Sequence, residues 1–472
     1  MSSSATNGGG ESCPSQQDIG IVNMEIYFPS NFVEQSELET HDGASTGKYT
    51  IGLGQTKMGF CNDNEDVISL CLTAVSRLMK KSSVTYSDIG YMAVGTETHI
   101  DQSKSVKAEL MRLFTESGNH DVGGTDHKNA CYGGTDAFLS CCSWVAAGFG
   151  DYALAVCGDI AVYSKGNARP TGGAGAVAML IGRNAALIMD HGLTSHHSEN
   201  VYDFYKPIPT SEYPTVDGKL SIECYLKSLD ACYAKYCARA NKKHGTSPDL
   251  SSFDAVLFHT PFCKLVQKSF ARLSLNDFVR TAKDERLAKA PGLEAFLNVE
   301  LENSYMDRDV EKAFMSHSKE LFEAKTKPSL MLATNVGNMY TPSLYGGLIS
   351  YVQGAESTEK MAGTKVACFS YGSGLVSAFF SLRVSSDISP MSPLSMLRRS
   401  LSDVQSRLEA RTKATPEEFS QTLDLREKVH NVAPYKPITG PEGLFPGTYY
   451  LTQIDEMRRR HYEQAKSIQN GH

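Results

Sequence analysis

The sequence lacks an apolar run of the roughly 20 residues that a membrane-spanning helix needs. It also lacks a basic tract, and its net charge is −7, which argues against a nucleic-acid surface. No two of its 12 cysteines form a C-x-x-C pair, so we expect no metal site. Residues 1–17 are polar, rich in glycine and serine and free of arginine, unlike a signal or transit peptide. We predict a disordered lead over residues 1–17 and a cytoplasmic protein with reduced cysteines and no membrane partner.

The chain instead alternates helix-like segments with apolar, strand-like ones. Residues 18–28 have the alternation of a strand, and residues 64–81 have the apolar spacing of a helix. Residues 151–163 and 172–182 are almost wholly apolar, as strands covered on both faces are. This alternation predicts a layered α/β fold.

The order strand, helix, strand, glycine turn, strand occurs twice. The second copy uses residues 253–259, 341–354 and 365–384, the last of which holds two strands joined at a Gly-Ser-Gly turn. Each copy is far longer than a solenoid repeat, so we expect two related halves. The predicted organisation is an N-terminal half at 18–190, a C-terminal half at 191–383 with a helical insertion near 275–327, and a C-terminal extension at 384–472 packed on the core.

Four further segments have patterns of their own. Residues 327–338 predict a strand entering a polar loop. Residues 384–405 are rich in serine and contain two prolines, which indicates a surface linker. Residues 416–430 begin with proline and acids and end with basic residues, which predicts a helix. Residues 447–464 predict a short strand followed by a polar helix.

Cys131 lies in the segment NACYGG, where a polar approach enters a helix-like run. The start of a helix favours a negative charge by about 0.3–1 kcal/mol. One pKa unit corresponds to about 1.4 kcal/mol, so the helix alone leaves this thiol mainly protonated at neutral pH. A nucleophilic role therefore needs a base or a cation nearby. The ordinary alternative is a buried structural cysteine.

Two strand ends supply candidates for that neighbour. His259 ends the apolar segment FDAVLFH, and Thr260-Pro261 suits the start of the next helix. Glu97 lies at the end of another strand-like segment, IGYMAVGTET, and is a possible general base. A structural histidine and an exposed glutamate are the alternatives.

Polar residues in the second half suit ligand contact. Lys264, Lys268 and Arg272 recur every four residues, a basic stripe that would fit phosphates at the far end of a substrate. Asn338 and Ser373 lie in polar glycine turns and are candidate hydrogen-bond donors. The alternatives are that the basic stripe is an ordinary solvated helix face and that Asn338 and Ser373 are ordinary turn residues. The GAGAVA segment at 173–178 resembles a dinucleotide fingerprint only loosely, because a strand and not a helix comes after it.

Seven segments together resemble the hydroxymethylglutaryl-CoA synthase family of the eukaryotic type, and the NVGNMYT form is closer to plant-like members. They are GASTGKYTIGLGQ, NACYGGT, GNARPTGGAGAVAMLIG, YDFYKP, FHTPFCKLVQKS, NVGNMYTPSLY and SYGSGL, in order over roughly residues 18–460. The resemblance implies the thiolase-like α/β fold, with two pseudo-repeated five-layered αβαβα halves, a homodimer, and chemistry that needs no cofactor.

The resemblance also implies roles. It makes Cys131 the acylated nucleophile, Glu97 the general acid/base and His259 the third catalytic residue. Positions that would contact the substrates are Asn167, Thr171, Ser221, Lys264, Lys268, Asn338 and Ser373. Asp159 and Asp203 match polar positions that support the site.

The implied reaction has three steps and belongs to the mevalonate pathway to isoprenoids. Cys131 takes the acetyl group of acetyl-CoA. Glu97 removes a methyl proton, and the resulting carbon nucleophile attacks the ketone of acetoacetyl-CoA. Water then cleaves the thioester to Cys131, releasing 3-hydroxy-3-methylglutaryl-CoA. The alternatives are another condensing enzyme of this fold, such as a ketoacyl-ACP synthase or a thiolase, and a non-catalytic CoA-binding protein.

Overall fold

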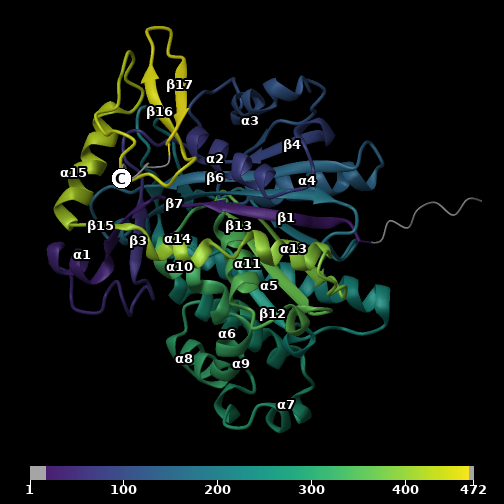
Figure 1. Cartoon of the computed structure of the whole chain (residues 1–472). Helices are drawn as coiled ribbons and strands as arrows, with labels where there is room; N and C mark the ends of the chain where they lie inside the picture. The colour runs from purple at the N-terminus through teal and green to yellow at the C-terminus, as the bar shows by residue number, and fades with distance from the viewer. Residues whose placement is uncertain (1–17, 467–472) are drawn as a thin grey trace, which may run out of the picture.

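The computed structural model describes residues 18–466 (Figure 1). The lead predicted over residues 1–17 lies outside the described residues, as do residues 467–472. The strands are β1 Gly20–Tyr27, β2 Asn31–Glu34, β3 Lys57–Phe60, β4 Ile89–Gly95, β5 Asp126–His127, β6 Tyr152–Ala161, β7 Gly173–Gly182, β8 Leu187–Met189, β9 Ser195–Ser198, β10 Phe204–Tyr205, β11 Thr215–Val216, β12 Ala255–Phe258, β13 Lys365–Gly372, β14 Val376–Val384, β15 Thr412–Ala414, β16 Tyr449–Ile454 and β17 Arg460–Gln464.

The helices alternate with these strands along the chain. They are α1 Gln35–His41, α2 Val67–Lys80, α3 Val106–Leu110, α4 Gly133–Ala146, α5 Gly218–His244, α6 Cys263–Arg280, α7 Lys283–Lys289, α8 Arg308–His317, α9 Lys319–Lys325, α10 Met331–Val336, α11 Ser343–Gly354, α12 Thr358–Met361, α13 Pro393–Ser400, α14 Val404–Glu409 and α15 Pro416–Val429. Among the residues described, no helix is both long and apolar enough to cross a membrane.

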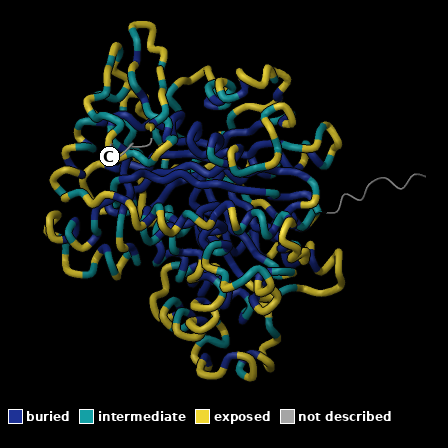
Figure 2. The backbone as a smooth tube through the Cα atoms, viewed as in Figure 1, coloured by how far each residue is buried: buried dark blue, intermediate teal, exposed yellow. Residues whose placement is uncertain are grey.

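The elements stack in five layers (Figure 1). Helix α2 covers one face of β1, β6 and β7, and α4 covers the other face together with α11. Beyond α4 and α11 lie β12–β14, whose far face is covered by α5 and α6. Three large apolar clusters fill the spaces between the layers, and Figure 2 shows the central strands buried and the rim exposed. The expected layered α/β architecture is confirmed.

The strands of both groups join into one ten-stranded mixed sheet, because β8 pairs with both β1 and β14. In the first group β4 runs parallel to β6, which is antiparallel to β7. In the second group β12 runs parallel to β13, which is antiparallel to β14. The carboxyl ends of parallel neighbours meet at one edge, so the segments directly after β4 and β12 take comparable positions in the two groups.

Residues 327–336 are helical, so the strand predicted there is wrong, whereas the polar loop predicted at its end is present at residues 337–338. A short 3-10 turn at Lys327–Leu330 leads into α10. The run LMLA is a short apolar segment, for which periodicity does not separate a strand from a buried helix.

The segment 384–405 is more than a surface linker, because it contains α13 and the start of α14. Leu394, Leu397, Leu401 and Val404 are fully buried and join the central apolar cluster against β1. Their spacing is that of a helix face, a signal that the serines and prolines between them obscured.

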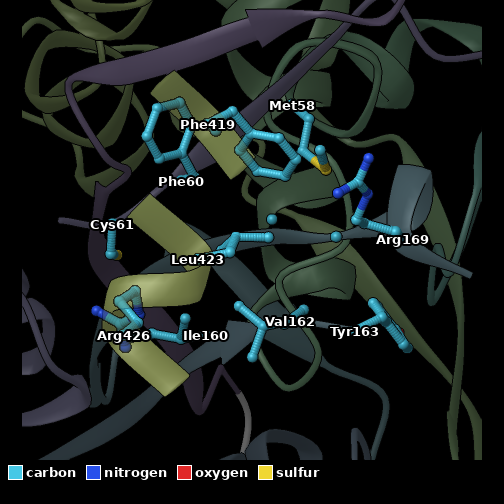
Figure 3. Close-up of a pocket in the computed structure, with 14 residues that line it drawn as sticks. Met58, Phe60, Cys61, Ile160, Val162, Tyr163, Arg169, Phe419, Leu423 and Arg426 are labelled. Carbon is cyan, nitrogen blue, oxygen red and sulfur yellow. The ribbon is translucent and has the colours of Figure 1, made fainter. Parts of the chain in front are cut away.

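The end of the extension is a hairpin, so the final helix predicted within residues 447–464 is wrong. Strands β16 and β17 pair from Tyr449↔Gln464 to Ile454↔Arg460. The helix predicted at 416–430 is confirmed as α15, which packs on β2 and, through Phe419, against Phe60 of β3. Figure 3 shows Phe419, Leu423 and Arg426 of α15 around a small cavity of about 10 Å³, which has room for about one water molecule.

Candidate active site

The loop that carries Cys131 lies between the ends of β4 and β13, one strand from each group. Gly95 ends β4, and a Cβ atom added there would lie 2.3 Å from the backbone carbon of Gly133. Gly372 ends β13, and a Cβ atom there would lie 2.6 Å from the backbone nitrogen of Tyr132. Side chains are excluded at both positions, which lets the two groups of strands approach the loop.

Cys131 immediately precedes α4, as the sequence predicts. Tyr132 is the N-cap residue, and the helix begins at Gly133. Ala130 has a φ of +43°, a left-handed conformation that residues other than glycine rarely adopt. Such backbone strain is concentrated at functional sites, where the surrounding structure enforces it.

The thiol of Cys131 donates a hydrogen bond to Glu97, with 3.2 Å between Sγ and Oε1. The Glu97 side chain is only 6% exposed. Burial raises the pKa of the Cys131 thiol well above its ordinary value, and the Glu97 carboxylate raises it further. Burial also raises the pKa of Glu97. The resting thiol is therefore protonated and faces a proton acceptor.

Lys206, which comes directly after β10, contacts the other oxygen of this carboxylate. Its Nζ lies 3.4 Å from Oε2 of Glu97. It also lies 4.8 Å from the ring centroid of Tyr340 and 5.9 Å from that of Phe204. Sequence reasoning identified the YDFYKP motif but gave its lysine no role, because nothing in the sequence links position 206 to position 97.

Asp159 holds the Glu97 segment in place. The aspartate is fully buried in β6. Its Oδ1 accepts hydrogen bonds from the backbone nitrogens of Glu97 and Thr98, at 2.8 and 2.9 Å. Its Oδ2 accepts one from the backbone nitrogen of Thr341, at 3.0 Å. Asp159 therefore joins the loop after β4 to the approach to α11.

Asp203 plays the same part for Ser373. It is fully buried, and its carboxylate accepts hydrogen bonds from the Tyr371 hydroxyl, at 2.7 Å, and from the backbone nitrogen of Gly374, at 2.9 Å. The Ser373 carbonyl in turn accepts a hydrogen bond from the Asn129 side chain, at 3.2 Å. The predicted Gly-Ser-Gly turn is thus anchored beside the Cys131 loop.

His259 comes directly after β12, the parallel neighbour of β13, and is 3% exposed. Its backbone nitrogen bonds to the Phe369 carbonyl, and its own carbonyl accepts the Tyr225 hydroxyl. Within residues 18–466 its ring makes no hydrogen bond, and burial lowers the pKa of His259 to about 3. The imidazole is therefore neutral at physiological pH. Helix α6 begins at Cys263 with Phe262 as its N-cap, so the helix start predicted at Thr260-Pro261 is wrong.

Asn338 lies in the segment that approaches α11, at a place comparable with that of Cys131 before α4. Its Oδ1 accepts hydrogen bonds from the Tyr340 backbone and the Ser343 hydroxyl, both at 2.8 Å. Its amide nitrogen is left for another acceptor. Tyr340, two residues on, has a φ of +54°.

A second group of predicted residues lies around the start of α6. The backbone nitrogen of Lys264 bonds to the Leu53 carbonyl, so the glycine-rich loop 44–56 packs on this helix end. Lys48 of that loop donates to the Asn167 side chain at 2.9 Å. Lys48 was not predicted, although its loop was among the resembling segments.

The basic stripe on α6 is shorter than predicted. Lys264 bonds to the Gln267 side chain and Lys268 pairs with Glu311 at 3.1 Å. Arg272 is buried and pairs with Asp230, so it is not available to a phosphate. The expected stripe is wrong at its third residue.

Thr171 and Ser221 complete the predicted set. Thr171 donates its hydroxyl to the Ala168 carbonyl, and its own carbonyl accepts the backbone nitrogen of Asn338. Ser221 is partly buried in the first turn of α5, where its backbone nitrogen bonds to the Asp217 carbonyl.

A large open hollow of about 1070 Å³ reaches this region. Glu97, Asn129, Lys206 and Ser373 line one end, and residues of the C-terminal extension line the other. Lys264, Lys268 and Asn167 lie outside this hollow. Among the residues described, no cluster of three or more histidine, cysteine, aspartate or glutamate side chains could hold a metal ion.

The five-layer stack and a thiol–carboxylate pair where strands of both groups end define a condensing enzyme with the thiolase-like fold.

Comparison with known proteins gives the particular family. The profile of the hydroxymethylglutaryl-coenzyme A synthase N terminal matches residues 15–186, and that of the C terminal matches residues 187–465. The chain is 52% identical to the cytoplasmic hydroxymethylglutaryl-CoA synthase of Homo sapiens over 453 residues, covering 94% of this chain and 87% of the relative. It is 51% identical to the mitochondrial one of Sus scrofa over 456 residues, covering 94% and 89%.

A solved structure, MvaS in complex with 3-hydroxy-3-methylglutaryl coenzyme A, matches with a TM-score of 0.80 at 29% identity, over 95% of this chain and 100% of that chain. The chain belongs to the hydroxymethylglutaryl-CoA synthase family. Its activity is the condensation of acetyl-CoA with acetoacetyl-CoA to 3-hydroxy-3-methylglutaryl-CoA, a step of the mevalonate pathway to isoprenoids.

Proposed function

We propose that Cys131 is the acetylated nucleophile of this reaction, Glu97 its general base and His259 a neutral hydrogen-bonding partner of the second substrate. The observation that carries the proposal is the 3.2 Å contact between Sγ of Cys131 and Oε1 of Glu97. A thiol with a raised pKa needs an acceptor for its proton when it attacks, and this carboxylate is in reach.

The first step is acyl transfer. Sγ of Cys131 attacks the thioester carbon of acetyl-CoA while its proton passes to Glu97. The bond to the CoA sulfur breaks, the proton passes from Glu97 to that sulfur, and CoA leaves as the thiol. The acetyl group is then carried on Sγ, the atom that lies 3.2 Å from Oε1 in the free enzyme, so the regenerated carboxylate is close to the acetyl group for the next step.

The second step forms the carbon–carbon bond. Glu97 removes a methyl proton, and the enolate carbon attacks the ketone of acetoacetyl-CoA. The new alkoxide takes a proton, which Glu97 now holds. His259 is neutral, so it serves here as a hydrogen-bond donor to the ketone oxygen and not as an imidazolium acid. Water then cleaves the Cys131 thioester and frees the product.

We propose that Asn167, Thr171, Ser221, Lys264, Lys268, Asn338 and Ser373 contact the substrates. The proximity of Lys48, Asn167 and the start of α6 supports a site for a CoA chain beside the loop 44–56. Helix N-termini and lysines both favour phosphate groups. The anchoring of Ser373 beside Asn129 supports its contact with the acyl end.

A separation of the two steps tests the roles. In the Glu97→Ala variant, incubation with labelled acetyl-CoA should still label Cys131, because loss of the carboxylate removes the proton acceptor but also lowers the pKa of the thiol; mass analysis of the Cys131 peptide measures the label, and condensation should be lost. Cys131→Ala should lose both. Condensation by Glu97→Ala at the parental rate would remove the base assignment, and no label on Cys131 in the parent would remove the nucleophile assignment.

We further propose a homodimer in the cytoplasm. The short strand β5 stands at one end of the sheet order, where a second copy could extend the sheet. Elsewhere in the chain, the apolar side chains of Tyr202 and Ile208 are exposed. The eleven described cysteines are all free thiols, which suits a reducing compartment. Light scattering measures the mass in solution, and a fluorescent fusion in cells gives the compartment.

We also propose a domain organisation for the chain. It consists of related halves at 18–190 and 191–383, a helical insertion near 275–327 and a C-terminal extension at 384–472. The matching strand directions in the two groups support related halves, and superposing β4–β6–β7 on β12–β13–β14 tests it. A plant-like origin is likewise proposed from the NVGNMYT segment. Alignment with plant synthases should give identities above the 53% found with the Mus musculus protein.

A further inference from the structure

Glu97 is held by a different group at each of its carboxylate oxygens. Oε1 lies 3.2 Å from Sγ of Cys131, and Oε2 lies 3.4 Å from Nζ of Lys206. The carboxylate side chain is 6% exposed and the lysine side chain 20% exposed. An ion pair shielded to this degree interacts much more strongly than one on the surface.

Burial and the nearby Asp159 carboxylate disfavour the charge of Glu97. Burial raises the pKa of Glu97 most, Lys206 is the cation that lowers it, the Asp159 carboxylate raises it, and the hydrogen bond from Cys131 lowers it to a smaller extent than Lys206 does. A base must be unprotonated to accept a proton, so a buried carboxyl without its cation would be neutral over more of the pH range.

Lys206 is itself confined. Its ammonium lies 4.8 Å from the ring centroid of Tyr340 and 5.9 Å from that of Phe204, and both rings favour the charge. The backbone before it is anchored as well. The Asp203 carbonyl accepts the Asp217 nitrogen at 2.9 Å, and β10 pairs with β11.

We propose that Lys206 is a positioning residue for the condensation step: it holds Oε2 of Glu97, keeps this buried carboxylate ionised and leaves Oε1 turned towards Cys131. The inference rests on the proposed role of Glu97 as the base. Lys206 touches no reacting atom and acts only through Glu97.

Other titratable groups share the site, and the test must separate them from Lys206. They are Cys131, Asp159, Tyr163 and Tyr340, which face Glu97, and His99, Lys128 and Asp101, which line the same hollow. None of them places a cation within salt-bridge distance of Glu97 in the described residues, whereas Lys206 does.

The test is the pH dependence of condensation in Lys206→Gln and Lys206→Arg. An opposite charge within about 4–6 Å typically shifts a carboxyl pKa by roughly 1–3 units. In Lys206→Gln, the acidic limb of the plot of kcat against pH should therefore move to higher pH by about one unit or more. At a pH on that limb, the condensation rate should fall about tenfold. Lys206→Arg keeps the charge and should keep the limb close to its original position.

The control is Lys227→Gln, which makes the same change of net charge on an exposed position of α5 and should leave the profile unchanged. Acetylation of Cys131, followed by peptide mass, and circular dichroism show that each variant is folded. An unmoved acidic limb in a folded Lys206→Gln overturns the inference. So does a raised KM for acetoacetyl-CoA with the limb in place, because that would make Lys206 a substrate contact.

The two proposals fail differently. If Glu97→Ala condenses at the parental rate, Glu97 is not the base, whatever Lys206 does. If Glu97→Ala is inactive in condensation and the Lys206→Gln profile is unmoved, only the role of Lys206 falls.

Discussion

Asp159 and Thr341, 182 positions apart in the sequence, are hydrogen-bonded through the backbone nitrogen of Thr341 and Oδ2 of Asp159. The same carboxylate accepts the backbone nitrogen of Glu97 on its other oxygen. One buried side chain thus fixes the relation between the base and the segment that enters α11.

Asp159→Asn should damage both stability and condensation. The asparagine side chain would place an NH₂ group where the aspartate oxygens accept hydrogen bonds from other donors. A buried polar group left without a partner lowers the free energy of unfolding by about 1–3 kcal/mol. We expect a lower urea midpoint, and condensation to fall more than Cys131 acetylation does, because the Glu97 backbone loses its anchor. Thr341→Ser keeps the hydroxyl and the backbone contact and serves as the control. An active Asp159→Asn enzyme of parental stability would contradict this role of Asp159.

The reactivity of Cys131 should increase when Glu97 loses its charge. Burial and the Glu97 carboxylate both raise the pKa of the thiol, so removal of the charge lowers that pKa and enlarges the thiolate fraction near pH 8. Glu97→Gln should therefore be alkylated by iodoacetamide faster than the parent. Asp101→Asn removes an exposed carboxylate of the same hollow and should not change the rate. Slower alkylation of Glu97→Gln would contradict this electrostatic effect of the carboxylate on the thiol.

His259 should contribute no titration to the pH profile of the enzyme. Its pKa is lowered to about 3 by burial, so the ring stays neutral from pH 5 to pH 9 and gains its proton only at more acidic pH. NMR of ring-labelled histidine should show no shift of His259 in that interval. A His259 midpoint near 6.5 would make an imidazolium acid possible and would reverse its assigned state.

The sequence predicted which residues belong to the site better than it predicted how they contact one another. The positions of Glu97 and His259 after strand ends were predicted because buried strands leave an apolar signature that stops at a polar residue. The contact of Lys206 with Glu97, and of Asp159 with Thr341, depends on how two groups of strands pack, and no local pattern records that. Arg272 shows the opposite error, because four-residue spacing predicted a basic face and the packing of Asp230 buried it.

Gly372→Ala should disable the enzyme by moving the nucleophile loop. A Cβ atom at this position would lie 2.3 Å from the Asn129 carbonyl and 2.6 Å from the Tyr132 nitrogen, distances at which backbone must shift. The loop around Cys131 cannot yield without displacing Sγ from its position for attack on the thioester, so acetylation by acetyl-CoA should fall by about 100-fold, the effect expected of a displacement near 1 Å. Gly218→Ala is the matched control, since a Cβ atom there meets nothing within 4 Å. Peptide mass after a timed incubation measures the acetylated fraction, and near-parental labelling of Gly372→Ala would show that the close packing of β13 against this loop is not needed for the first step.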